Sequence, residues 1–208
     1  MAIVGAGRTD AGVNARMMIA HLDLDSELSP EEERRIVAAL NAMIGRNIAL
    51  YGLHRVHDDA HARFDATSRT YRYYASLKKS PFTHDLTWQA PPTLDLDAMN
   101  AAASLMIGRR DFTSFSKLHT DTLTNICDLR VARWVRQDDE ISYFEITADR
   151  FLRNMVRAVV GTLVDVGRGK MAPEAVMEII DRKDRCAAGT SMPGHALFLW
   201  DITYPYSF

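Results

Sequence analysis

The chain has 208 residues, of which 47% are hydrophobic and 25% charged, and its formal net charge is −2. This composition suits a globular protein of one domain, or of two small halves that share a sheet, and the length is enough to bury a core. The sequence has no apolar run of about 18 residues and no signal-peptide pattern at its start, so it excludes a membrane span and favours a cytoplasmic protein.

The charges are unevenly distributed along the chain. Basic segments lie at 62–79, 108–112 and 151–157, and acidic segments lie at 23–33, 94–97 and 137–140. A negative net charge counts against a nucleic-acid partner, because proteins that bind nucleic acids usually present a basic surface. The clustering nevertheless allows a basic groove with an acidic back, so RNA binding stays open.

Short apolar runs alternate with helical patterns from the start of the chain, which is typical of an α/β or α+β fold. A strand is predicted at 15–24, and a helix follows at 29–45. The helix start carries Ser29 as N-cap, Pro30 in the first turn and Glu32 three residues after the cap. These are the signals of a capping box, so this helix should begin sharply.

Two further strands are predicted at 47–57 and 69–77, because both segments are rich in β-branched and aromatic residues. The loop 80–93 then offers a plausible linker. We therefore divide the chain into an N-terminal half, residues 1–85, and a C-terminal half, residues 86–208.

The C-terminal half is predicted to contain helices, a hairpin and a closing strand. The helices are expected at 96–108, 150–167 and 173–182, the hairpin at 126–149 and the closing strand at 196–204. The helix at 150–167 has its apolar residues on one stripe, which indicates the face that packs on the core.

The opening loop GAGRTDAG, residues 5–12, is the first candidate site. A dinucleotide-binding loop needs a third glycine where Asp10 stands, and no lysine of a phosphate-binding loop follows, so both phosphate readings are weak. The glycines instead indicate a turn that presents Arg8, Thr9 and Asp10. Asp10 is then either a turn former that bonds its own backbone or a functional carboxylate.

Metal binding is not favoured. His54, His57 and His61 lie close together, but on a strand the first two would point to opposite faces, so surface or groove histidines are the better interpretation. Cys127 and Cys186 are far apart and lack CxxC spacing, which indicates reduced thiols.

The strand at 69–77 places Tyr71 and Tyr73 on one face and Arg72 and Tyr74 on the other. Aromatic rings interleaved with arginines suit stacking on a base and pairing with phosphate. The alternative is a strand whose tyrosines fill a core beside solvated arginines. The strand alone leaves both interpretations open.

Arg153 and Arg157 lie four residues apart, and therefore on one face of the predicted helix at 150–167. An arginine beside an apolar stripe is often partly buried and then needs a carboxylate partner. The alternative is a side chain that extends along the helix surface into water.

The segments GAGRTDAGV, ARFDATSRTYRY, DFTSF, RFLRNMVRAVVGTL and GHALFLWDITYP resemble, in this order, the motifs of the tRNA pseudouridine synthase A family. The likeness runs over essentially the whole chain. It implies an α/β (α+β) body of two ferredoxin-like halves, with antiparallel and mixed sheets joined around a central basic cleft. It also implies a homodimer.

The resemblance implies a reaction too, the isomerisation of uridine to pseudouridine at nucleotides 38 to 40 of the tRNA anticodon stem-loop, without metal or organic cofactor. By the same resemblance Asp10 matches the catalytic aspartate and Arg157 the arginine that pairs with it. Arg8 matches an arginine that helps to expel the target base, Tyr71 a tyrosine that packs on the base, and Leu197 an apolar contact with it.

Two departures from the family pattern shape the alternatives. Family members carry about fifty residues before the GRTD segment, so a strand of the first half would be missing here and its neighbour exposed. The family commonly has histidine where Asn14 stands, and asparagine forms hydrogen bonds but carries no charge. We therefore keep a catalytically impaired RNA-binding module as the alternative, and a nucleotide-binding α/β protein as a weaker one.

Overall fold

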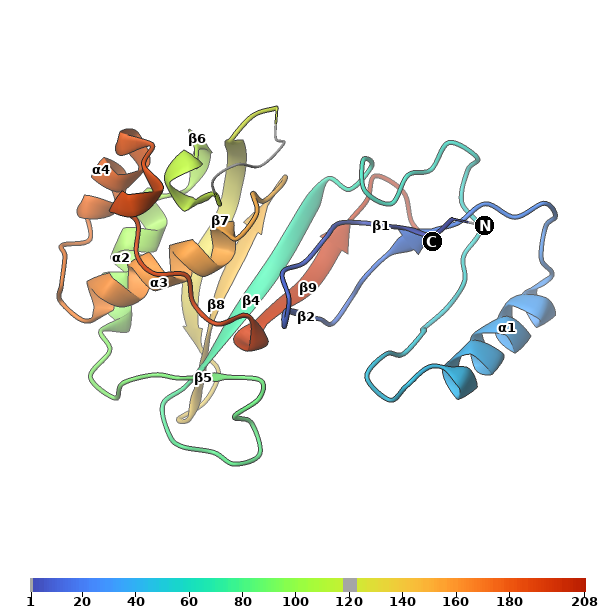
Figure 1. The fold of residues 1–208 in the computed structure, drawn as a ribbon, viewed down its shortest axis with the longest axis horizontal. Coiled ribbons are helices and arrows are strands. Elements are labelled where there is room, and N and C mark those ends of the chain that lie inside the picture. Colours follow the sequence, from blue (N-terminus) through green and yellow to red (C-terminus); the bar gives the residue numbers. More distant parts are fainter. Residues whose placement is uncertain (1, 118–122) are drawn as a thin grey trace.

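The computed structural model describes residues 2–117 and 123–208, and one large mixed sheet organises the fold (Figure 1). Its strands run in the order β2-β9-β4-β8-β7-β6, with β5 on the side of β4. Their bounds are β2 (Asn14–Ala15), β9 (Leu197–Thr203), β4 (Ser68–Ser76), β5 (Trp88–Gln89), β8 (Ile141–Ala148), β7 (Ile126–Arg136) and β6 (Gly108–Asp111). The pairs β2–β9 and β4–β5 are parallel, and the other pairs are antiparallel.

A two-stranded sheet and the helices complete the fold. β1 (Val4–Gly5) pairs antiparallel with β3 (Ala20–His21). The α-helices are α1 (Pro30–Met43), α2 (Leu96–Leu105), α3 (Met155–Gly167) and α4 (Ala175–Arg182), and the 3₁₀ helices are η1 (Thr113–Phe115), η2 (Arg185–Ala187) and η3 (Gly194–Ala196). Figure 1 shows α2, α3 and α4 on one side of the large sheet and α1 apart from them. The expected α+β class is confirmed.

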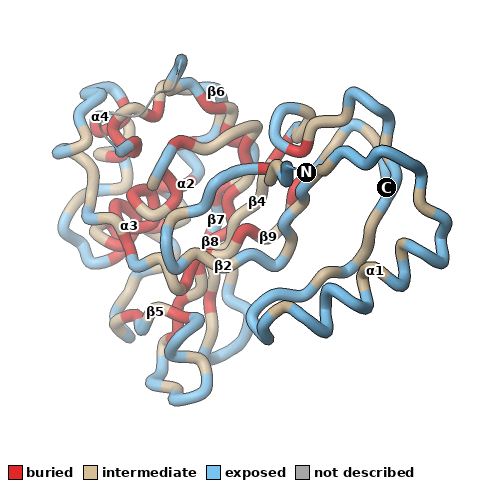
Figure 2. Tube along the Cα trace, turned by 45° about the vertical axis from the view of Figure 1, so that its right-hand side comes forward, coloured by how far each residue is buried: buried red, intermediate tan, exposed pale blue. Residues whose placement is uncertain are grey.

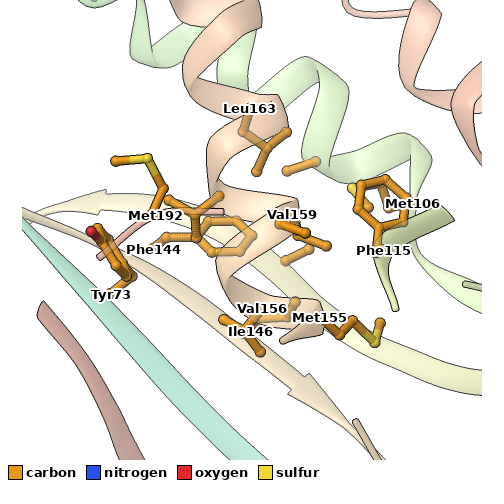
Figure 3. Close-up of a cluster of buried hydrophobic side chains, with 14 of the residues drawn as sticks. Tyr73, Met106, Phe115, Phe144, Ile146, Met155, Val156, Val159, Leu163 and Met192 are labelled. Carbon is orange, nitrogen blue, oxygen red and sulfur yellow. The ribbon is translucent and has the colours of Figure 1, made fainter. Parts of the chain in front are cut away.

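The hydrophobic core lies between the large sheet and the helices α2, α3 and α4. Every residue of α3 is buried except Arg157 and Asp165, so this helix is the centre of the core. Figure 3 shows the sheet side chains Tyr73, Phe144 and Ile146 against the α3 side chains Val156, Val159 and Leu163. Each fully buried side chain of this size contributes roughly 1.5 to 3 kcal/mol.

The helix α1 forms as its sequence predicts but buries nothing. Ser29 accepts a hydrogen bond from the backbone of Glu32, and the Glu32 carboxylate accepts one from the Ser29 backbone N–H. This capping box satisfies N–H groups that would otherwise lack partners at the helix start. No residue of α1 is buried, and Figure 2 shows it as exposed and intermediate along its length. Its stability therefore comes from local interactions.

Three expected elements differ from the structure. No strand forms at 47–57, because a strand needs a neighbouring strand with which to pair. Leu50 in this segment is instead held by two hydrogen bonds with the side-chain amide of Asn41. The strand expected at 15–24 is reduced to a few paired residues in β2 and β3. The helix expected from residue 150 starts at Met155, after Asn154 takes a left-handed φ of 66°.

The large sheet includes strands from both predicted halves of the chain. β4 belongs to residues 1–85, and it pairs with β8 and β9, which belong to residues 86–208. The hydrogen-bonded ladders thus join the halves in one sheet, while the division at residue 85 stays a prediction.

Candidate functional site

The opening loop leaves β1 and turns back toward β9. Ala6 is buried and anchors the start of the loop, and Gly12 takes a φ of 78°, which favours glycine because it has no Cβ. The backbone N–H of Val13 donates to the carbonyl of Asp10 at 3.1 Å. This turn places the Asp10 side chain, which is half-buried, on the side of the loop that faces α3.

Asp10 forms an ion pair with Arg157, although the two residues are 147 positions apart in the sequence. The Arg157 Nη1 donates to the Asp10 Oδ2 at 3.1 Å, and the two side chains are 23% and 22% exposed. The pair is therefore shielded from water but still reachable. The guanidinium balances the carboxylate charge and fixes its direction.

Arg157 is itself held on its other side by a carbonyl group. Its Nε donates to the Met192 carbonyl at 2.5 Å, and the Met192 N–H donates back to the Arg157 carbonyl at 3.1 Å. The chain at 189–192 can lie this close to α3 because residue 161 is glycine; a Cβ there would overlap the Thr190 carbonyl oxygen. Close packing thus aims the guanidinium at Asp10.

A second group of side chains fixes the segment that carries Met192. The Asn154 side chain donates to the Ser191 hydroxyl at 2.5 Å, and Arg185 Nη2 donates to the same hydroxyl at 2.8 Å. Arg185 Nη1 also donates to the Gly189 carbonyl at 3.1 Å. Sequence reasoning gave these residues no role, because they meet only after the chain folds.

Tyr71 lies beside the ion pair. It is half-buried on β4, and its ring makes an edge-to-face contact with Phe151 at 5.2 Å between centroids. Burial raises the pKa of Tyr71 to about 12; the Arg69 charge opposes this shift, and the Asp10 charge adds to it. The phenol is therefore neutral at physiological pH, and it is close enough to Asp10 to feel its charge.

Arg69 positions the opening loop and was also missed. Its guanidinium donates to the carbonyls of Ala6, Arg63 and Asp149 at 3.2, 2.8 and 3.1 Å, and burial lowers its pKa. A signal for this role was present in the sequence, because alternation puts Arg69 on the same strand face as Tyr71. A charged residue on a core-facing position needs partners.

The other predicted site residues lie around this centre. Arg8 is exposed, and within the described residues its side chain makes no ion pair or hydrogen bond. Leu197 begins β9 opposite Tyr73 and is only 4% exposed. Asn14 donates to the His195 carbonyl at 2.7 Å, so it ties the opening loop to the turn before β9.

The remaining candidates lie outside this centre. Tyr73 is fully buried under α3, which is the core alternative for that residue (Figure 3). Arg153 precedes α3 instead of sharing a helical face with Arg157, and it is exposed. His57 packs edge-to-face on Tyr206, and His61 packs on Phe64.

Neither a metal-binding cluster nor a membrane-spanning helix occurs in the described part of the chain. Among residues 2–117 and 123–208, no three side chains of the metal-ligating types gather closely enough to hold an ion. Within the same ranges, no helix has the length and apolar character needed to cross a membrane.

Comparison with known proteins decides the family. A family model described as tRNA pseudouridine synthase matches residues 102–205. The chain is 54% identical to tRNA pseudouridine synthase A of Parabacteroides distasonis, over 98% of this chain and 79% of the relative. It is 50% identical to the protein of that name from Bacteroides fragilis and 36% identical to that from Bacillus subtilis, over 80% and 81% of those relatives.

The chain belongs to the tRNA pseudouridine synthase family.

As a member of this family it is an isomerase that forms pseudouridine in tRNA. The family match begins at residue 102, after the opening loop, whereas the alignments to the relatives cover 97–98% of the chain in these three cases. The resemblance found in the sequence motifs is therefore confirmed over nearly the full length.

Proposed function

We propose that this tRNA pseudouridine synthase acts on nucleotides 38 to 40 of the anticodon stem-loop and that Asp10 is its catalytic carboxylate. The observation that carries the proposal is the half-buried ion pair of Asp10 with Arg157, with Tyr71 beside it. The assignment of the anticodon stem-loop rests on the resemblance of the motifs.

The reaction breaks the bond between uracil N1 and the ribose C1′ and joins C1′ to uracil C5. The C5 hydrogen leaves as a proton, and N1 takes up a proton, so the atoms of substrate and product balance. The base must be detached, turned and held while this happens. A carboxylate can add covalently to the sugar or the base, or it can stabilise and steer the detached species. The product is an isomer of the substrate with no net oxidation, so side chains suffice for the chemistry.

Arg157 serves this chemistry as the partner of the carboxylate. It sits on α3, where every residue except Arg157 itself and Asp165 is buried, so the backbone that carries the guanidinium is held by the core. Its second hydrogen bond to the Met192 carbonyl fixes its plane. Because the carboxylate already points in one fixed direction, little free energy is needed to reorient it during the reaction.

The target base must leave a paired or stacked stem before Asp10 can reach it. Flipping costs a few kcal/mol, which contacts to the extruded base and to the gap in the stem can offset. In our proposal Tyr71 packs on the base, Leu197 contacts it as an apolar wall, and Arg8 enters the stem. The exposed position of Arg8 on the loop suits the last role.

The test uses the isosteric variant Asp10→Asn in the full chain. We expect release of tritium from tRNA labelled at uracil C5 to fall by about a thousandfold or more, since a catalytic group is lost. Binding of tRNA should stay within about twofold, because the shape is kept.

The matched control is Asp165→Asn, which removes an aspartate from α3 and leaves the site untouched. Wild-type-like tritium release from Asp10→Asn would reject the catalytic assignment. Tight tRNA binding by the wild type without any tritium release would favour the impaired RNA-binding module instead.

The homodimer and the cytoplasmic location stay predictions. Sedimentation of the free chain measures its oligomeric state.

A further inference from the structure

A hollow of about 590 Å³ lies beside the site, between the loop that joins β4 to β5 and the turn before β9. Figure 1 shows this loop extending past the end of the large sheet. The hollow is lined by Ser76, Lys78, Lys79, Ser80, Pro81, His84, Thr87, Trp88, Gln89 and His195. None of the residues in this lining is acidic, although the chain as a whole is negative.

The basic side chains of the hollow suit an anionic ligand. Lys79 is exposed and has no ion-pair partner among the described residues, so its charge is available. Lys78 forms an ion pair with Glu140, with 3.2 Å between the lysine Nζ and the carboxylate Oε1, and both side chains are more than half exposed. An exposed pair of this kind is worth little and opens readily, so Lys78 can turn to a ligand.

The hollow and the Asp10 site share a wall. His195 lines the hollow, its Nε2 lies 3.2 Å from the Thr87 carbonyl, and its own carbonyl accepts the Asn14 side chain. The opening loop packs on the same turn, since a Cβ at residue 194 would lie 2.8 Å from the Ala11 carbonyl oxygen. The turn before β9 therefore contacts both the hollow and the loop that carries Asp10.

An aromatic side chain stands next to the hollow. Phe82 directly follows Pro81 of the lining and is 93% exposed. Its loop is ordered by two hydrogen bonds to the Thr83 carbonyl, from the Leu86 N–H and the Thr87 hydroxyl, each at 2.9 Å. An exposed ring on an ordered loop beside lysines is the combination that binds unpaired nucleotides, by stacking and by phosphate contact.

We infer that this loop is a second RNA contact, at which Lys79, with Lys78, binds a backbone phosphate and Phe82 stacks on an unpaired base near the target uridine. The inference rests on the proposed function, because it takes the tRNA as ligand. It adds a role for residues that the Asp10 chemistry does not use.

The experiment compares Lys79→Gln, Phe82→Ala and the charge-matched control Lys183→Gln in the full chain. Lys183 lies at the end of α4, where it pairs with Asp111. Binding of unmodified tRNA is measured over a range of salt concentrations, and tritium release gives kcat and KM for each variant.

Lys79→Gln should weaken binding several-fold and reduce the slope of log affinity against log salt by about 0.7 to 0.9, as expected for one lost phosphate contact. Phe82→Ala should weaken binding by about tenfold with the slope unchanged, because stacking carries no charge. For both, KM should rise while kcat stays near the wild-type value. Lys183→Gln should match the wild type.

The inference would be overturned if Lys79→Gln and Phe82→Ala bound tRNA like the wild type, with the same salt slope. Turnover by the wild type in the same experiment would still support the proposed function. A changed sedimentation of Phe82→Ala with unchanged RNA affinity would overturn it as well, because Phe82 would then contact a second copy. Absence of wild-type turnover would instead count against the proposed function, and the binding comparison would remain interpretable.

Discussion

At the scale of single residues, the direction of one carboxylate depends on a short chain of contacts. Asp10 is aimed by Arg157, Arg157 is aimed by the Met192 carbonyl, and the segment of Met192 is fixed through Ser191. Only the first of these contacts reaches Asp10, the carboxylate that we propose to be catalytic. Ser191 is therefore a positioning residue, whose loss should change the rate more than the binding of tRNA.

We predict that Ser191→Ala lowers kcat by about tenfold with little change in KM, because a small misplacement of the site costs rate. In an Arg157→Lys background the same change should have almost no further effect, since the group it positions is already altered. Tritium release measures all four proteins of this cycle.

Ser191→Thr keeps the hydroxyl and serves as the conservative control. It should restore most of the rate if the hydrogen bonds from Asn154 and Arg185 are what matters. Additive effects of Ser191→Ala and Arg157→Lys would contradict the positioning role, because Ser191 would then act independently of Arg157.

At the scale of elements, one carboxylate ties three strands together on the sheet face away from the helices. Glu145 of β8 faces Arg72 of β4 and Arg133 of β7 in the ladder registers, and accepts hydrogen bonds from both at 2.7 Å. The Arg72 guanidinium also lies 4.1 Å from the centroid of the Trp200 ring. These cross-strand contacts stabilise the face of the sheet that α2, α3 and α4 do not cover.

The pKa of Glu145 gives this cluster a pH dependence. Burial would raise the pKa, but the hydrogen bonds from Arg133 and Arg72 outweigh it and lower the pKa below 4.5. The carboxylate therefore contributes stability that is complete above its ordinary pKa of 4.5 and is lost as the pH falls through the lower folded value.

We predict that Glu145→Gln lowers the free energy of unfolding by about 1 to 3 kcal/mol at pH 7. The difference from the wild type should shrink as the pH falls below 4.5, since the wild type then loses the same charge. Urea unfolding at a series of pH values measures this.

Glu140→Gln is the control, because Glu140 belongs to the exposed pair with Lys78 and should cost less than about 1 kcal/mol. A destabilisation by Glu145→Gln that stays constant down to pH 3, an acidity well below 4.5, would contradict the assigned cause.

At the scale of the whole molecule, the buried residues are concentrated around α3. α3 buries all but two of its residues and α1 buries none, and Figure 2 shows this contrast along the chain trace. Opening of a helix costs free energy in proportion to what it buries. The part of the chain that carries α1 is therefore held less firmly than the part that carries Arg157.

We predict that hydrogen exchange reflects this contrast. Amides of α1 should exchange at least about a hundredfold faster than those of α3, because α1 opens locally whereas α3 opens only with the core. Peptide-level exchange followed by mass spectrometry resolves the two helices. Equal protection would show that α1 is covered in solution, and dependence on protein concentration would identify a second copy as the cover.

Much of the fold follows from local sequence signals, and the failures have a common cause. The capping box at Ser29 and the apolar stripe of α3 act within one helix, so they could be predicted. The segment 47–57 has β-forming residues and no strand, because pairing needs a neighbour that no local pattern reveals. Arg69 was missed for a related reason, since its carbonyl partners come from three separate loops.

The sequence by itself determined the α+β class, the main helices and strands, and the motifs that identify the family. The motifs also led us to expect the pair of Asp10 with Arg157, which the structure shows. The tertiary structure alone decided that the Met192 carbonyl aims Arg157 and that His195 joins the site to a basic hollow. The reason is physical. Helix caps and periodicity act between residues a few positions apart, whereas these contacts exist only when packing brings distant segments within hydrogen-bond reach.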